Sequence, residues 1–268
     1  MSNIFHRNNV TVTGRLDRPA IVFGHGFGCD QGMWRFVQPA FADSHCCVLF
    51  DHVGCGRSDL AAFSDQRHAR LEGYAADVLE VLDAVDRDPV TFIGHSASAI
   101  IGLLAAIEAP RQFSRLVLLA PSPRFIDAPP DYVGGFARED VDELMALMER
   151  NPLGWAAMFA PLAMPGERDP ALTSELESSL GSGDPYAARM FARAIFYSDY
   201  RNALDRVDTP ALVVQCSRDH IAPPSVGEFM RRHLRGSELT TIDAAGHCPH
   251  MSHPCETVAA IRDFINAE

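Results

Sequence analysis

Short apolar runs alternate with longer amphipathic stretches along most of this 268-residue chain. This alternation is typical of β-α-β units, in which helices connect parallel strands and cover both faces of a sheet. The apolar runs predict strands at 20–24, 46–50, 90–94, 115–120, 211–216 and 238–242, with an antiparallel edge strand at 9–13. Helical periodicity predicts helices at 71–86, 97–109, 225–234 and 256–266. We therefore expect an α/β fold with a mostly parallel central sheet flanked by helices.

One long interval interrupts the alternation. Between residues 125 and 197 no strand is predicted, but helical stretches continue at 138–150, 153–162, 171–180 and 186–197. Asp169-Pro170 and Asp184-Pro185 each have the form of a helix cap followed by proline at the first helical position. We interpret 125–197 as a four-helix lid inserted between two strands, and 1–124 together with 198–268 as the core of the fold.

Composition excludes several classes of function. The formal net charge of −12 argues against nucleic acid as a partner, because phosphate backbones are bound by clustered Lys and Arg. No apolar run approaches the roughly 18 residues of a membrane span, so we expect no membrane association. The first residues lack the apolar centre of a signal peptide, and the seven cysteines form no C-x-x-C pair. These features predict a cytoplasmic protein with reduced thiols.

The strongest chemical signal is Gly94-His95-Ser96-Ala97-Ser98, which follows a predicted strand and opens a predicted helix. A serine in such a tight turn has its hydroxyl exposed above the sheet, provided that the residues two before and two after it are small. Gly94 fits this rule, and Ser98 is small although glycine is usual there. The sequence therefore predicts Ser96 as a nucleophile, with the backbone N–H of Ala97 as an oxyanion donor at the helix start.

A second loop predicts the other oxyanion donor. His25-Gly26-Phe27-Gly28 follows the first buried strand, where a glycine-rich loop of this kind supplies a backbone N–H to the oxyanion. We assign this donor to Phe27 and expect His25 to brace the loop.

A serine hydroxyl needs a base, and the base needs an acid that fixes its tautomer. Asp219 ends one predicted strand, and His247 follows Gly246 after the last one, which gives the order Ser…Asp…His of α/β hydrolases. His250 and His253 compete for the role of base. We choose His247 because it sits on the loop that reaches the edge of the sheet.

Two other motifs in the sequence suggest a bound metal or a bound nucleotide. The segment 247–255 is rich in His and Cys, but we expect Pro249 and Pro254 to prevent the helix that would gather three histidines around a metal. The segment 51–59 resembles a dinucleotide-binding fingerprint, but Asp59 occupies its third glycine position. We therefore expect neither a metal nor an organic cofactor.

Six segments together resemble one family of α/β hydrolases: HGFGCDQGMW, LFDHVGCGRSDL, GHSASAIIG, APSPRF, GGFARED and GHCPHMSHP. The chain is similar to RsbQ, a bacterial stress-signalling hydrolase, and to the plant karrikin and strigolactone receptors. The resemblance implies a core with Ser96, Asp219 and His247 and a V-shaped lid over an apolar pocket. It also implies an aromatic pocket lining, by Phe27, Phe125, Phe136, Trp155, Phe159 and Phe196. The alternative is that each aromatic side chain only packs the lid helices together.

Two functions follow from these expectations. The first is hydrolysis of a small, largely apolar ester or lactone by a serine enzyme. The second is a ligand-sensing signalling module whose slow hydrolysis is incidental. For the second, the resemblance implies a protein partner, which for RsbQ is a PAS-containing phosphatase. Both functions use the same pocket, so the sequence does not separate them.

Overall fold

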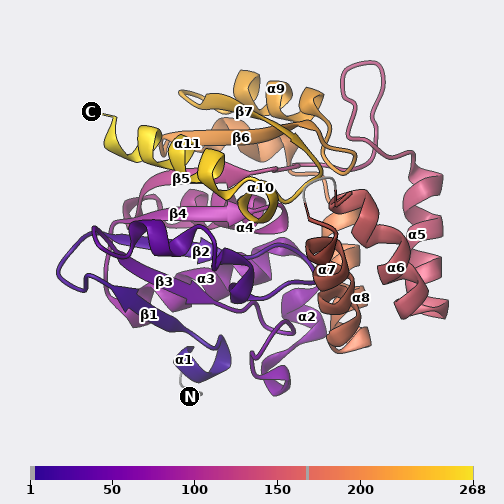
Figure 1. Ribbon diagram of the computed structural model, residues 1–268, viewed down its shortest axis with the longest axis horizontal. Helices are drawn as coiled ribbons and strands as arrows, with labels where there is room; N and C mark the ends of the chain where they lie inside the picture. The colour runs from indigo at the N-terminus through magenta and orange to yellow at the C-terminus, as the bar shows by residue number, and fades with distance from the viewer. Residues whose placement is uncertain (1–3, 167–168, 268) are drawn as a thin grey trace.

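A computed structural model describes residues 4–166 and 169–267, which leaves the outermost residues of the expected core and two residues of the expected lid outside the description. Its centre is a seven-stranded sheet in the order β1-β3-β2-β4-β5-β6-β7 (Figure 1). The strands are β1 (Thr11–Gly14), β2 (Ala20–Gly24), β3 (Cys46–Phe50), β4 (Val90–His95), β5 (Phe113–Leu119), β6 (Ala211–Arg218) and β7 (Glu238–Ala245). β1 pairs antiparallel with β3, and every other pairing is parallel. The expected α/β fold with a mostly parallel sheet is confirmed.

The central strands are covered on both faces. Every residue of β2 and β3 is buried, as continuous apolar strands in a parallel sheet require. In Figure 1, α11 crosses in front of the sheet, while α3 and α4 lie behind it. Among the described residues outside 125–197, the α-helices are α1 (Ile4–Arg7), α2 (Asp65–His68), α3 (Leu71–Val85), α4 (Ala97–Glu108), α9 (Pro224–His233), α10 (Pro249–Ser252) and α11 (Pro254–Asn266).

The edge strand begins two residues later than the sequence predicts. The first described residues form the short helix α1, and Asn9 then takes a left-handed φ of 44° that turns the chain into β1. The sequence places the start of this strand too early, because a helix as short as α1 shows no clear helical periodicity. Short 3-10 helices, which the sequence also did not predict, lie at Gln31–Trp34, Gln38–Phe41, Leu60–Ala62, Pro110–Gln112 and Arg201–Arg206.

Four consecutive helices lie between β5 and β6 in the chain and form the right-hand side of Figure 1. They are α5 (Arg138–Arg150), α6 (Pro152–Ala163), α7 (Pro170–Ser182) and α8 (Pro185–Phe196). The Asp169 and Asp184 side chains accept hydrogen bonds from the first backbone N–H groups of α7 and α8, and proline follows each cap, as predicted. Asn151-Pro152 caps α6 in the same way.

This helical segment contacts the loops at the carboxyl ends of the strands. The Ser179 hydroxyl on α7 donates to the Gly28 carbonyl at 2.7 Å, just after β2. The His247 N–H, just after β7, donates to the Ala163 carbonyl at the end of α6 at 2.7 Å. The segment therefore covers the edge of the sheet at which the predicted site residues lie.

Candidate active site

Ser96 occupies a sharp turn between β4 and α4. Its backbone has φ 53° and ψ −114°, outside the usual regions for a residue with a side chain. A Cβ atom at Gly94 would lie 2.4 Å from the carbonyl oxygen of Ser98, so only glycine fits at that position. The Ser96 N–H donates to the Leu119 carbonyl at 2.8 Å, which ties the turn to the neighbouring strand β5. The predicted strand-turn-helix context of Ser96 is thus present.

His247 reaches Ser96 from the loop after β7. Gly246 turns the chain after β7 with a φ of 95°, and a Cβ there would lie 2.8 Å from the Ala163 carbonyl oxygen. The His247 Nε2 atom lies 2.8 Å from Ser96 Oγ, and its Nδ1 atom lies 2.7 Å from Asp219 Oδ2. This is the geometry in which a histidine can take a proton from a serine hydroxyl.

Asp219 is buried at the end of β6, yet its carboxylate is well satisfied. Its Oδ1 atom accepts the backbone N–H groups of Ile221 at 2.8 Å and Ala222 at 3.1 Å. Its Oδ2 atom faces His247. These bonds fix the carboxylate and leave one oxygen directed at the imidazole, which selects the tautomer with a proton on Nδ1.

His250, the main competitor for the role of base, lies elsewhere. Its fully buried ring packs against Trp34 at 4.7 Å and His95 at 4.4 Å between centroids. Burial lowers the pKa of His250 to about 3, and neither ring nitrogen has a hydrogen-bond partner among the described residues. The structure therefore brings His247, and not His250, to Ser96.

The three histidines of this segment do not share a helix, as the two prolines predict. Pro249 and Pro254 are the first residues of α10 and α11, and His247 and His253 lie outside both helices. Proline is suited to that position because its missing N–H would have no partner there. Within residues 4–166 and 169–267, no group of three or more metal-ligating side chains is found.

The loop after β2 lies close to the nucleophile turn. A Cβ at Gly26 would lie 2.3 Å from His95 Nδ1, so glycine allows the loop to approach this ring. The His25 ring connects this loop to the loop after β3. Its Nδ1 atom lies 2.8 Å from the Gly26 carbonyl oxygen, and its Nε2 atom accepts the His52 N–H at 3.0 Å. His25 therefore braces the loop that carries Phe27. Ala97 is the first residue of α4.

The sequence alone assigned no role to His95. Its Nε2 atom lies 2.8 Å from the His247 carbonyl oxygen. Burial lowers the pKa of His95 well below its usual value, so the neutral ring donates Nε2–H to that carbonyl. His95 thus holds the backbone of the residue that faces Ser96. No local signal identifies this contact, because the two residues are 152 positions apart.

A cavity of about 30 Å³ opens beside Ser96 and His247. Four of the predicted aromatic residues border it, namely Phe27, Phe125, Phe159 and Phe196. Trp155 and Phe136, which were also predicted to line it, do not. The Trp155 ring lies behind Phe159, stacked at 4.8 Å between centroids, and Phe136 packs against Phe196 at 6.1 Å. The two residues support the wall of the cavity instead of forming it.

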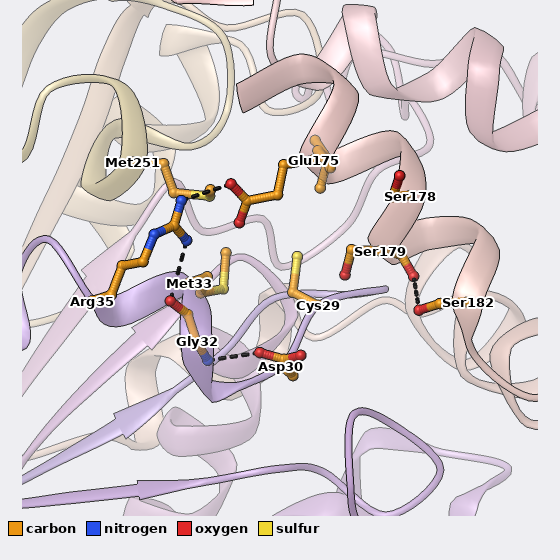
Figure 2. A pocket seen from close by; sticks show the side chains of 11 residues that line it. Cys29, Asp30, Gly32, Met33, Arg35, Glu175, Ser178, Ser179, Ser182 and Met251 are labelled. Atoms are coloured by element: carbon orange, nitrogen blue, oxygen red, sulfur yellow. Dashed lines mark hydrogen bonds and ion pairs between the residues drawn. The ribbon is translucent and has the colours of Figure 1, made fainter. Parts of the chain in front are cut away.

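A larger groove of about 520 Å³ lies between α7 and the segment after β2 (Figure 2). An ion pair of 2.6 Å between Arg35 and Glu175 joins the segment after β2 to α7 there. Cys29 and Leu176 border both the groove and the small cavity, so they form the partition between them. The groove contains none of Ser96, Asp219 and His247 and is not the candidate site.

A mostly parallel sheet with a nucleophile-type serine turn after a central strand defines the class of α/β hydrolases. Residues 21–261 match the model of the Alpha/beta hydrolase family. The chain is 38% identical to Karrikin insensitive 2 receptor IA of Petunia hybrida over 247 residues, 92% of this chain and 90% of that protein. It is 36% identical to Strigolactone esterase D14 of Arabidopsis thaliana over 261 residues, 97% of each.

A solved structure supports the same conclusion. A hydrolase from Oleispira antarctica has a TM-score of 0.97 and 42% identity, over 99% of this chain and 97% of that one. The chain belongs to the α/β hydrolase family, and its predicted likeness to plant karrikin and strigolactone receptors is confirmed. No helix in the described part of the chain is long and apolar enough to cross a membrane.

Proposed function

We propose that the protein hydrolyses a small, largely apolar ester or lactone. In this mechanism Ser96 attacks the carbonyl carbon, His247 takes the serine proton and later returns it to the leaving group, and Asp219 orients His247. The backbone N–H groups of Phe27 and Ala97 stabilise the oxyanion. No step needs a cofactor.

The observation that carries this proposal is the continuous hydrogen-bonded series from Asp219 through His247 to Ser96, with distances of 2.7 and 2.8 Å. It ends at a cavity walled by phenylalanines, which favours an apolar group beside the reacting carbonyl. The cavity of about 30 Å³ is much smaller than a typical ligand pocket. Substrates must therefore be small, or a wall side chain must move to admit them.

Covalent labelling tests this proposal. A fluorophosphonate probe should modify Ser96 and no other serine, because only there do a base and oxyanion donors converge. Peptide mass spectrometry locates the label, and Ser96→Ala should abolish it. Ser217→Ala, which changes a partly exposed serine outside the cavity, should label like the wild type. Labelling that persists in Ser96→Ala would falsify the assignment.

The names of the relatives favour a second candidate, a ligand sensor with slow turnover. Several relatives are named as karrikin insensitive receptors, and others are named as strigolactone esterases. In that case the proposed partner is a signalling protein such as a PAS-containing phosphatase. The proposed location is the cytoplasm, which suits seven free cysteines.

Turnover kinetics separate the two candidates. An enzyme should release many equivalents of p-nitrophenol from p-nitrophenyl acetate at a constant rate, whereas a sensor should stop after about one equivalent. A pull-down of a purified PAS-containing phosphatase, with and without a butenolide lactone, completes the test. Ligand-dependent capture together with a single turnover supports the sensor, and steady turnover without capture supports the enzyme.

A further inference from the structure

Ser98 is the position at which the nucleophile turn departs from its usual glycine, and its hydroxyl joins three elements. It is fully buried in the first turn of α4. It donates a hydrogen bond to the His25 carbonyl, in the loop that carries Phe27. It also lies 2.5 Å from Nε2 of His52, in the loop after β3.

The direction of each hydrogen bond in this cluster follows from the chemistry of its members. The single hydroxyl proton of Ser98 goes to the His25 carbonyl, so His52 must donate through Nε2–H. The His52 backbone N–H donates to His25 Nε2, so His25 carries its proton on Nδ1 and donates it to the Gly26 carbonyl. Burial lowers the pKa of both imidazoles, which keeps them neutral and suited to these roles.

Packing holds the cluster in place. The His52 ring makes edge contacts with Phe50 at 5.1 Å and Tyr74 at 5.8 Å between centroids. A Cβ at Gly24 would lie 3.0 Å from Ser98 Cβ, so glycine at the end of β2 lets α4 approach closely. The hydroxyl therefore reaches the loop because the neighbouring strand presents no side chain.

We propose that Ser98 is a positioning residue for hydrolysis, which orients the 24–28 loop so that the Phe27 N–H meets the developing oxyanion. His52 holds the Ser98 hydroxyl in the required rotamer. Ser98 itself does not touch the substrate, because the cavity beside Ser96 is bordered by other residues. The inference rests on the proposed function. It explains why serine stands at position 98, where glycine is usual.

Single and double substitutions separate positioning from stability. Ser98→Ala removes the donor to the His25 carbonyl and also leaves buried His52 Nε2–H without its acceptor. His52→Phe keeps a ring at that site but removes the hydrogen bond. In the double variant Ser98→Ala/His52→Phe no buried imidazole N–H is stranded, so its stability should exceed that of Ser98→Ala. The 24–28 loop would still lack the hydrogen bond that Ser98 donates to the His25 carbonyl.

A matched control is available in α11. Thr257 is fully buried, and its hydroxyl donates to the His253 carbonyl at 2.9 Å. Thr257→Val removes a buried hydroxyl-to-carbonyl hydrogen bond, as Ser98→Ala does, but at a place outside the cavity.

The measurements are kcat and KM for p-nitrophenyl acetate, the rate of fluorophosphonate labelling at Ser96, and Tm. Ser98→Ala should lower kcat and the labelling rate by about 10- to 100-fold, since a displaced oxyanion donor loses transition-state stabilisation, while KM changes much less. The double variant should recover Tm but keep the low kcat. Thr257→Val should lower Tm and leave kcat and the labelling rate unchanged.

Two results would overturn the inference. One is a kcat for Ser98→Ala no lower than that of Thr257→Val. The other is a double variant whose kcat recovers together with its Tm, since Ser98 would then act only through stability. Both presuppose wild-type labelling at Ser96. If the wild type itself does not label there, it is the proposed function that fails.

Discussion

Ser96 is held in an unfavourable backbone conformation, with φ 53° and ψ −114°. Such conformations cost on the order of 1–3 kcal/mol and persist only where the surroundings hold them. Here the support is the hydrogen bond from the Ser96 N–H to Leu119 at 2.8 Å and the close contact of Gly94 with the first turn of α4. In this turn Ser96 Oγ lies 2.8 Å from His247 Nε2.

The choice between two histidines gives a prediction at this scale. His247→Ala should lower kcat for p-nitrophenyl acetate by at least ~10³-fold, because the serine loses its base. His250→Leu should change kcat little, since the ring packs between Trp34 and His95 and does not contact Ser96. Steady-state kinetics of the two purified variants decide the matter. If His250→Leu is the more damaging change, the base has been assigned to the wrong residue.

At the scale of elements, α6 and α7 form much of the wall between the cavity and solvent. Phe159 on α6 faces the cavity, and Trp155, one helical turn earlier, stacks on its outer side. Leu176 and Leu180, also one turn apart, are the cavity residues of α7. Residues at this spacing share a helix face, but only the packing of neighbouring helices decides which of them meets the cavity.

This arrangement predicts different effects for the two aromatic residues of α6. Phe159→Ala enlarges the cavity, so the ratio of kcat/KM for p-nitrophenyl hexanoate to that for the acetate should rise about 10-fold. Trp155→Phe leaves a void behind the wall, so it should lower Tm and leave this ratio unchanged. Kinetics with both esters and thermal melts test the prediction. An equal shift in the ratio for both variants would show that Trp155 also contacts the substrate.

For the whole molecule, acid stability is governed in part by buried histidines. His25, His52, His95 and His250 are buried, and desolvation lowers the pKa of each. In the unfolded chain these groups regain a pKa near 6.5. Below that pH the unfolded state binds more protons than the folded state, so stability is complete above about pH 6.5 and is lost as the pH falls.

We therefore expect the free energy of unfolding to decrease between pH 6.5 and pH 5, by up to about 1.4 kcal/mol per pH unit for each histidine. Carboxylates with a lowered pKa, such as Asp199 with a pKa of about 2, change the free energy of unfolding only at a pH below this range. His250→Leu should reduce the number of protons taken up on unfolding in this range by about one. Urea unfolding at several pH values measures the slope. A flat profile over this range would contradict the expectation.

The sequence by itself determined the α/β fold, the positions of most strands and helices, and the residue types of the site. Strand and helix periodicity, proline-led caps and the Gly94–Ser98 turn are local signals, because they depend on neighbours within a few residues. The order of Ser96, Asp219 and His247 along the chain was equally readable. Their catalytic roles, like the division into core and lid, stay predictions.

The tertiary structure decided which of these residues meet. His247 and Ser96 are 151 positions apart, and Ser98 and His52 are 46 apart. Trp155 and Phe159 share a helix face in the sequence, yet only one borders the cavity. Pro249 and Pro254 begin α10 and α11, which leaves His247 and His253 outside both helices. Each outcome depends on the order of strands in the sheet and on the packing of the inserted helices, which bring together loops that share no local pattern.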